Sequence, residues 1–182
     1  QQGDFQQTNN RLDLVIHGSR FFQVRRDTGD LAYTRSGAFH LDKDGNVVTL
    51  NGDALEPQIT IPPEAQAITI ATDGTVSYSL PGQTNSQLAG QIQLANFTNP
   101  AGLNSIGENL FLPTDASGDP TVGNPGGQEG LGTLQQGYLE GSNVSVVEEF
   151  INLIVSQRAY EANSKVVKAA DEMYQQVNNI SQ

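Results

Sequence analysis

The two histidines of the chain do not have the spacing of a metal or catalytic site. His17 stands directly before Gly18, and His40 lies within a predicted strand. A histidine zinc site usually places its ligands a few residues apart, as in the H-E-x-x-H motif of a helix. The chain has no cysteine, which excludes thiolate ligands, a thiol nucleophile and disulfides. We therefore predict no metal site and no catalytic histidine.

The segment Asp42-Lys-Asp-Gly-Asn46 is the most metal-like stretch, because it resembles the start of a calcium-binding loop. Such a loop requires glycine at its sixth position and glutamate at its twelfth. Here glycine is the fourth residue and Asp53 occupies the twelfth position, so we predict a hairpin turn.

Other catalytic patterns are also missing from the sequence. The glycine-rich stretch 123–132 lacks the order of a dinucleotide-binding loop, and no G-x-S-x-G motif of a serine hydrolase occurs. Glu148 and Glu149 suit the first turn of a helix, where carboxylates interact favourably with the helix dipole. We predict that the protein is not an enzyme and that it has no catalytic residues and no cofactor.

The composition favours a protein that packs against other proteins. The 182 residues carry a formal net charge of −11, which argues against nucleic acid as a partner. Eighteen glutamines and fifteen asparagines make the surface polar without charge, so copies of the chain can pack closely with little desolvation of charge. Residues 36–140 hold eleven acidic residues and one lysine, which either keep the protein soluble or face a basic partner.

The sequence gives no sign of membrane insertion. No apolar run approaches the roughly 18 residues of a transmembrane helix. The opening residues, QQGDFQQTNN, have neither the basic start nor the apolar stretch of a cleavable signal peptide.

Residues 12–97 have the pattern of an antiparallel β unit, with short apolar runs separated by turn residues. Asn51-Gly52 and Asp73-Gly74 are two-residue hairpin signals. Residues 1–11 are expected to be an extended connecting segment. The predicted strands cover residues 13–16, 21–24, 31–35, 38–41, 47–50, 58–62, 67–71, 75–80 and 91–97.

Residues 98–132 contain four prolines and a glycine-rich run, a composition that predicts a long excursion within a β domain of residues 12–141. Residues 134–139 are expected to return as a strand.

From residue 142 the pattern becomes that of one long helix, since no glycine or proline occurs between Ser142 and Gln182. Ser145 and Glu148 form a predicted capping box at its start. About 36 residues at roughly 1.5 Å each would extend about 54 Å. The predicted fold is therefore mainly β with a long C-terminal α-helix, residues 142–182, that packs in an oligomeric tube.

This helix carries two apolar stripes. One recurs at steps of three and four residues from Ile151 to Ile180, and its alanines permit close helix approach. The other recurs every seven residues from Val146 to Tyr174. A helix docked on one small domain needs only one apolar stripe, so we predict neighbours on two sides. The predicted assembly interface comprises Val146, Phe150, Ile151, Leu153, Val155, Tyr160, Ala162, Val166, Val167, Met173, Tyr174 and Val177.

Two simpler arrangements would also cover such a helix. One is a two-stranded coiled coil, and the other is a helical hairpin within a single chain.

The segment SNVSVVEEFINLIVSQRAYEANSKVVKAADEM (142–173) closely resembles the C-terminal signature of bacterial flagellar axial proteins, the rod and hook proteins. LDLVIHGSRFFQV (12–24) and AYTRSGAFHLDKDGNVVTLNGDAL (32–55) resemble the shared β domain of that family. NSIGENLF (104–111) and GTLQQGYLEGSNV (132–144) are most similar to its distal-rod branch. Members begin with a helix of their own, which is expected to precede this chain.

The resemblance implies a structural role. Copies would stack helically into a hollow drive shaft that transmits torque from motor to hook and passes exported subunits. The first helix of the family would pair with the C-terminal helix in the inner tube. Proximal rod and hook proteins would be axial partners, and basal-body ring proteins would surround the shaft. Export through the flagellar type III apparatus would bring the protein to the periplasm without a cleavable signal.

Two other readings of the sequence stay open. Proximal rod and hook proteins share these ends, although hook proteins usually carry additional outer domains. A different class would be a secreted β-rich binding module or hydrolase with a helical tail. That protein would be a monodisperse monomer, whereas an assembly subunit would self-associate through its helix.

Overall fold

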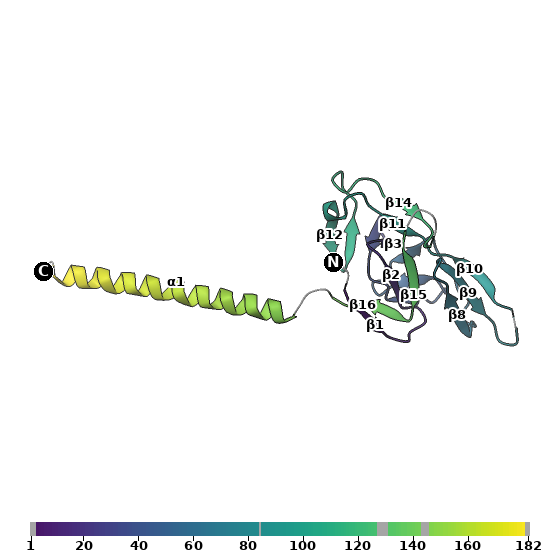
Figure 1. Cartoon of the computed structure of the whole chain (residues 1–182), viewed down its shortest axis with the longest axis horizontal. Helices are drawn as coiled ribbons and strands as arrows, with labels where there is room; N and C mark the ends of the chain where they lie inside the picture. The colour runs from purple at the N-terminus through teal and green to yellow at the C-terminus, as the bar shows by residue number, and fades with distance from the viewer. Residues whose placement is uncertain (1–2, 84, 127–130, 143–145, 181–182) are drawn as a thin grey trace. The chain divides into compact units, whose positions relative to one another are not determined.

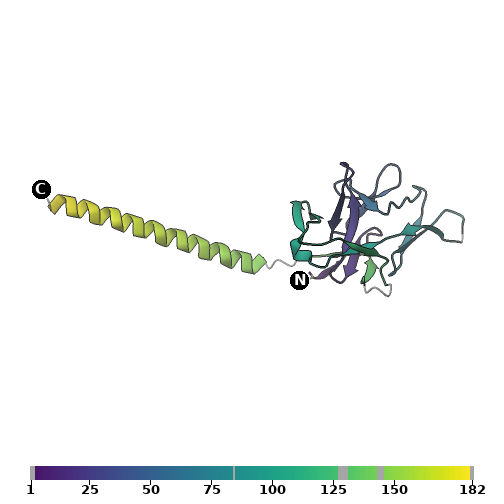
Figure 2. The same cartoon turned by 90° about the horizontal axis from the view of Figure 1, so that it is seen from above.

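The structure is a computed structural model that describes residues 3–83, 85–126, 131–142 and 146–180. The chain divides into two units, Gln1–Gly141 and Ser142–Gln182 (Figure 1). The first unit is made of antiparallel β-sheets, and the second contains the helix α1 (Val146–Ile180) (Figure 2). This arrangement confirms the predicted fold class.

The described part of the first unit contains sixteen short strands and one 3₁₀ turn, Pro100–Gly102. The strands are β1 (Phe5–Gln7), β2 (Leu14–His17), β3 (Phe21–Arg25), β4 (Leu31–Thr34), β5 (Phe39–Leu41), β6 (Val47–Thr49), β7 (Ala54–Glu56), β8 (Ala67–Ile70), β9 (Thr75–Ser79), β10 (Gln87–Gln91), β11 (Leu94–Asn96), β12 (Asn104–Gly107), β13 (Leu110–Leu112), β14 (Thr121–Gly123), β15 (Thr133–Gln136) and β16 (Tyr138–Glu140).

The largest sheet has nine strands, of which seven follow the order β12-β13-β4-β3-β7-β6-β5. In this sheet β11 pairs with both β3 and β14. Strands β8, β9 and β10 form a separate three-stranded sheet, while β15 pairs with β2 and β1 pairs with β16. The β1–β16 pair joins the two ends of the unit, because Phe5 lies opposite Glu140.

Strand β3 lies at the centre of the unit and is buried on both faces. Phe22 and Val24 belong to the larger hydrophobic cluster, and Phe21 belongs to a second cluster on the other face together with Tyr33 and Phe97. Side chains alternate between the two faces of a strand, so a strand covered on both faces reads as a continuous apolar run.

Residues 98–132 differ from the predicted excursion, because β12, β13 and β14 lie within them and join the largest sheet. Strand β13 pairs with β4, and β14 pairs with β11. The ring centroid of Phe111 is 5.8 Å from that of Phe21, and Leu110 is buried. Prolines and glycines mark the turns of this segment, whereas Leu103, Leu110, Phe111 and Leu112 pack in or against the hydrophobic clusters.

Three smaller predictions also differ from the structure. Residues 1–11 are more than a connecting segment, since they contain β1. The predicted strand 91–97 is divided between the last residue of β10 and the whole of β11. The predicted strand 58–62 forms only an isolated bridge between Thr60 and Asn46. Pro57, just before it, and Pro62, at its end, cannot donate the hydrogen bonds that would extend a ladder.

The hairpin at Asn51-Gly52 has a longer loop than the predicted two-residue turn. The backbone N–H of Thr49 donates to the carbonyl of Asp53 at 2.8 Å, which leaves residues 50–52 as the loop. Gly52 closes it with a φ of 96°, a conformation that glycine adopts without strain. Leu50 therefore stands at the hairpin tip, where 75% of its surface is exposed.

An ion pair joins the end strand β16 to the body of the β unit. The Nη2 and Nε atoms of Arg35 lie 2.7 Å and 3.1 Å from Oε2 of Glu140. The Nη1 atom of Arg35 donates to the backbone carbonyls of Gly18 and Arg20. The backbone N–H of Gly3 donates to Oε1 of Glu140 at 2.9 Å. This cluster, the Arg35–Glu140 clasp, thus connects the segment just before β1, strand β16 and the β2–β3 turn.

Substitution of Arg35 by glutamine should destabilise the β unit by about 2 kcal/mol, because it leaves a poorly solvated carboxylate unpaired. The matched control is Arg25→Gln, which removes the more exposed Arg25–Glu56 pair and should cost less than about 1 kcal/mol. Urea unfolding of the whole chain measures the change in unfolding free energy for both variants. Hydrogen exchange of peptides within residues 3–83 serves as the readout for the β unit. Equal effects of the two substitutions would contradict a special role for the clasp.

Candidate functional site: an assembly surface

The helix α1 runs from Val146 to Ile180 and has 35 residues. At roughly 1.5 Å per residue it is about 52 Å long. Among the helices of the described residues, none is long and apolar enough to cross a membrane. In α1, the structure describes the side chains of residues 150–170 and of Met173.

Large apolar side chains on α1 are exposed along the described part of the helix. Their exposed fractions range from 49% for Ile154 to 77% for Tyr160. The exposed set consists of Phe150, Ile151, Leu153, Ile154, Val155, Tyr160, Val166, Val167 and Met173. Single exposed apolar residues are ordinary, but nine on one helix favour the prediction of an interaction surface.

The exposed apolar residues form two stripes on the helix surface. With about 100° of rotation per residue, Ile151, Val155 and Val166 fall within one arc of roughly 60°. Leu153, Tyr160 and Val167 fall within a second narrow arc, about 140° around the helix from the first. The shorter path between the stripes carries neutral residues, namely Asn152, Ser156, Asn163 and Ala170.

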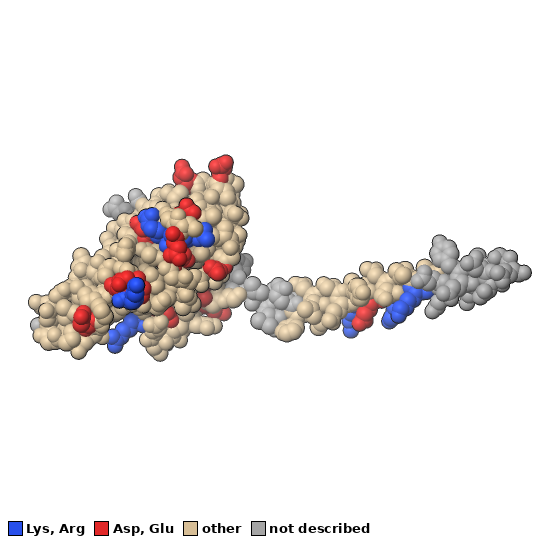
Figure 3. All heavy atoms as spheres, turned by 180° about the vertical axis from the view of Figure 1, so that it is seen from behind, with Lys and Arg blue, Asp and Glu red and all other residues tan. Residues whose placement is uncertain are grey.

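The four charged residues of α1 whose side chains are described occupy the remaining side of the helix. Arg158, Glu161, Lys165 and Lys168 fall within an arc of about 80°, opposite the neutral strip between the stripes. Figure 3 shows these charges gathered along one edge of the helix. The charged strip is the side best suited to face water, while the two stripes offer separate surfaces for two neighbours.

The first described turns of α1 are apolar on more sides than the rest. Phe150 and Ile154 lie in the arc that the charged side chains occupy further along. Ile154 was not among the predicted interface residues, because it belongs to neither stripe. Its spacing of four residues from Phe150 and three from Ile151 is the signal that would have found it. A helix segment that is apolar all round is expected to be enclosed by partners.

The structure describes most of the predicted interface residues. Ala162 and the eight predicted residues from Phe150 to Met173 that are large and apolar are exposed. The side chains of Val146, Tyr174 and Val177 lie outside the described residues, as do Ser145 and the side chain of Glu148 that were expected to cap the helix. The role of all these residues in assembly stays a prediction.

The β unit offers little that suggests chemistry at a metal or catalytic centre. Within the described residues, no group of three metal-binding side chains occurs. His17 lies in β2 with its Nε2 atom 2.7 Å from Oε1 of Gln135, and its ring contacts Phe5 edge-on. His40 is exposed in β5.

Asp42 serves the turn between β5 and β6, as the departure from the calcium-loop pattern predicted. Its carboxylate accepts hydrogen bonds from the backbone N–H groups of Asp44 and Asn46 and from Nδ2 of Asn46. Hydrogen bonds from Asn46, first from its side chain and then from its backbone, lower the pKa of Asp42 below its usual value. The carboxylate is thereby committed to the turn.

Comparison with known proteins relates both units to one group. Residues 15–78 match the family described as "Flagellar hook protein FlgE/F/G D1 domain", and residues 135–180 match "Flagellar basal body rod FlgEFG protein C-terminal". The flagellar basal-body rod protein FlgG of Buchnera aphidicola is 47% identical over 179 residues, which cover 98% of this chain and 68% of that relative. The FlgG protein of Caulobacter vibrioides is 47% identical over 180 residues, covering 99% and 68%.

A hook protein is matched over a shorter stretch. The flagellar hook protein FlgE of Escherichia coli is 42% identical over 113 residues, which cover 61% of this chain and 27% of that relative. The correspondence along the whole chain is therefore with rod proteins.

The two stripes predict specific effects on self-association. Val166→Asp in the first stripe and Val167→Asp in the second should each weaken association of the chain about tenfold, since burying a valine contributes roughly 1.5 kcal/mol or more. Gln157→Asp introduces the same charge on the charged side and is the control. Sedimentation at increasing concentration measures association, and circular dichroism checks that helix content is unchanged. A chain that is monomeric throughout, with a folded helix, would contradict the prediction.

Proposed function

The chain belongs to the family of flagellar hook and basal-body rod proteins, and on this basis we propose that it builds the hollow drive shaft of the distal rod. It is an axial structural subunit of the flagellar basal body, as predicted. In the proposed assembly, copies stack helically, transmit torque from the motor to the hook, and leave a central channel through which exported subunits pass.

The observation that carries the proposal is the match to FlgG proteins along nearly the whole chain. FlgG is a distal rod protein, so the predicted resemblance to the distal-rod branch is confirmed. The hook alternative is weaker, because the match to the Escherichia coli hook protein covers only 61% of this chain. The two apolar stripes of α1 favour a polymer over a secreted monomeric module or hydrolase.

We propose that α1 lines the inner tube and that its two stripes contact different neighbours. The chain spans about two thirds of the length of the rod relatives that it matches. The N-terminal helix expected from the family would cover one stripe, and helices of adjacent copies would cover the other. Each valine, leucine or isoleucine so buried contributes roughly 1.5–3 kcal/mol, which makes a series of nine exposed side chains a substantial source of association energy.

The β unit would form the outer layer of the shaft and carry load between copies. Antiparallel ladders and a core on both faces of β3 make it resistant to shear. Torque would be shared by many contacts in parallel, so each contact can be modest while the assembly stays stiff. No catalytic step is part of this mechanism.

The proposed setting is the periplasm, which the protein would reach through the flagellar type III apparatus. Proximal rod proteins would contact one end of the distal rod and hook proteins the other. The surrounding ring proteins would meet the outer face, where the acidic residues of the segment 36–140 would present a hydrated surface that permits rotation.

Deletion of the gene should leave basal bodies that lack hooks and filaments, because nothing would continue the axis beyond the proximal rod. Cells should be non-motile, and the full-length gene should restore swimming. Electron microscopy of purified basal bodies provides the measurement. Normal hooks in the deletion strain would rule out the proposed role.

Reversal of outer acidic charges should impair ring assembly or rotation. Asp44 and Glu64 are exposed and suit the test, whereas Asp42 holds its turn and Glu56 pairs with Arg25. The double variant Asp44→Lys/Glu64→Lys should swim more slowly while secreting and assembling rods normally. Asp27→Lys, outside the acidic segment, is the control. Wild-type swimming by the double variant would refute the acidic-face hypothesis.

A further inference from the structure

The strip of α1 that lies between the two apolar stripes is neutral along residues 150–170. It consists of Asn152, Ser156, Asn163 and Ala170, of which the first three are exposed and Ala170 is half-buried. The hydroxyl of Ser156 donates a hydrogen bond to the backbone carbonyl of Asn152 at 2.8 Å, so the helix itself satisfies this donor. The neutral strip is therefore a surface of short side chains without an ionic group.

The angle between the stripes indicates which side of α1 would face the inside of a tube. In a ring of helices, the directions from one helix to its two neighbours enclose the smaller angle on the side of the channel and the larger angle on the outer side. The apolar stripes lie about 140° apart on the side of the neutral strip and about 220° apart on the side of the charged strip. When a neighbouring helix covers each stripe in such a ring, the neutral strip faces the channel.

The distribution of charge supports the same orientation of the helix. The charged strip holds three basic side chains, Arg158, Lys165 and Lys168, and one acidic side chain, Glu161. Residues 36–140 of the β unit hold eleven acidic residues and one lysine. In the proposed shaft the β units surround the helices, so a charged strip that points outward would face a layer of opposite charge.

We propose that the neutral strip of α1 lines the channel of the rod and is the surface along which exported polypeptides pass. The inference rests on the proposed function, because it requires a tube of helices that encloses a channel. The partner is an extended polypeptide that carries acidic and basic side chains alike. A lining without charge neither attracts nor repels these ionic groups, and its short side chains leave the channel wide.

Single cysteines test this orientation, because the chain has no cysteine of its own. The variants Asn163→Cys, on the neutral strip, and Lys165→Cys, on the charged strip, are made in the full-length protein in cells. The probe is an exported flagellar subunit with cysteines along its length, fused to a tightly folded domain that stalls it in the channel. Oxidation should cross-link the probe severalfold more to rods of the Asn163→Cys variant than to rods of the Lys165→Cys variant.

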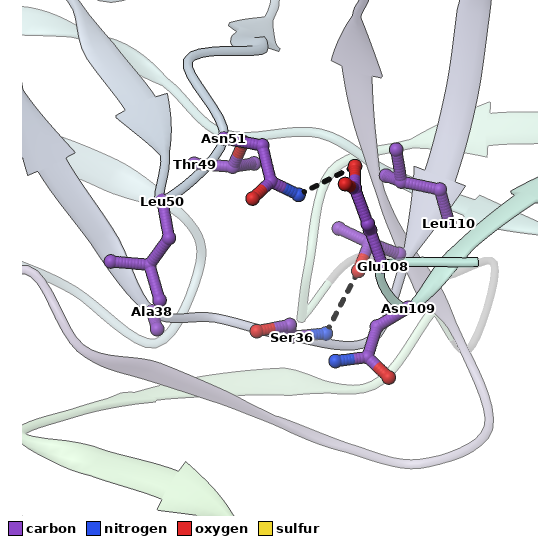
Figure 4. A pocket seen from close by; sticks show the side chains of 9 residues that line it. Ser36, Ala38, Thr49, Leu50, Asn51, Glu108, Asn109 and Leu110 are labelled. Atoms are coloured by element: carbon purple, nitrogen blue, oxygen red, sulfur yellow. Dashed lines mark hydrogen bonds between the residues drawn. The ribbon is translucent and has the colours of Figure 1, made fainter.

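The variant Leu50→Cys in the β unit is the control for cross-links that form outside the channel. Leu50 is 75% exposed, and it lies on the wall of a pocket between two hairpin tips of the β unit (Figure 4). Because the β unit belongs to the proposed outer layer, this variant should give no cross-link to the stalled probe. Ser156→Cys and Lys168→Cys form a second matched pair on the two strips, for use where a variant of the first pair does not assemble.

The outcomes separate this inference from the proposed function. Rods that cross-link the probe equally through both strips, or mainly through the charged strip, would overturn the inference and leave the proposed function intact. Rods that contain the variants but give no cross-link from the neutral strip would overturn it as well. If the unsubstituted protein is missing from purified rods, both fail.

A second measurement needs no cross-link. Asn163→Lys and Asn163→Glu should each slow the export of hook and filament subunits severalfold through assembled rods, because repetition in every copy would line the channel with charges that attract oppositely charged side chains of the passing polypeptide. Gln157→Lys and Gln157→Glu place the same charges on the charged side and should leave the export rate unchanged. Wild-type export through assembled rods of both Asn163 variants would overturn the inference.

Discussion

The helix α1 presents apolar side chains on two separate sides, and hydrophobic burial of both sides is the constraint on which the function depends. A single small domain can shield one face of a helix, but the stripes lie about 140° apart around the axis. The charged strip with Arg158 and Lys165 leaves one side for water. A subunit with this pattern is expected to be most stable when partners cover both stripes, and the polymer proposed above would provide them, because each helix would contact several others.

The sequence predicted the elements whose signals are local. The helix, the strands β2 to β4 and the turn at Asp42 follow from periodicity and turn chemistry over a few residues. The strands of the segment 98–132 were harder to predict from the sequence, because β12 to β14 are only three or four residues long. Their position also depends on the contact of Phe111 with Phe21, which is far away in the sequence. The composition of this segment indicates the prolines at its turns, but it does not indicate which side chains pack on the core.

On the proposed assembly surface, too, the sequence indicated only the residues that follow a regular period. Periodicity found both stripes, yet Ile154 lies outside them and is visible only as a neighbour of Phe150 and Ile151. The geometry of two hairpin tips also lay beyond sequence reasoning. The loop between β6 and β7 is one residue longer than Asn51-Gly52 predicts, and Glu108 adopts a positive φ that its residue type does not favour.

The β1–β16 pair has a mechanical consequence for a load-bearing subunit. Both strands leave the β unit at the same end, so a pull on their outer ends would peel the ladder open one hydrogen bond at a time. Peeling would start beside Phe5 and Glu140. Glu140 accepts hydrogen bonds from two nitrogens of Arg35 and from the backbone N–H of Gly3, which lies just before β1. The Arg35–Glu140 clasp thus strengthens the end of the β1–β16 ladder at which separation of the two strands would begin.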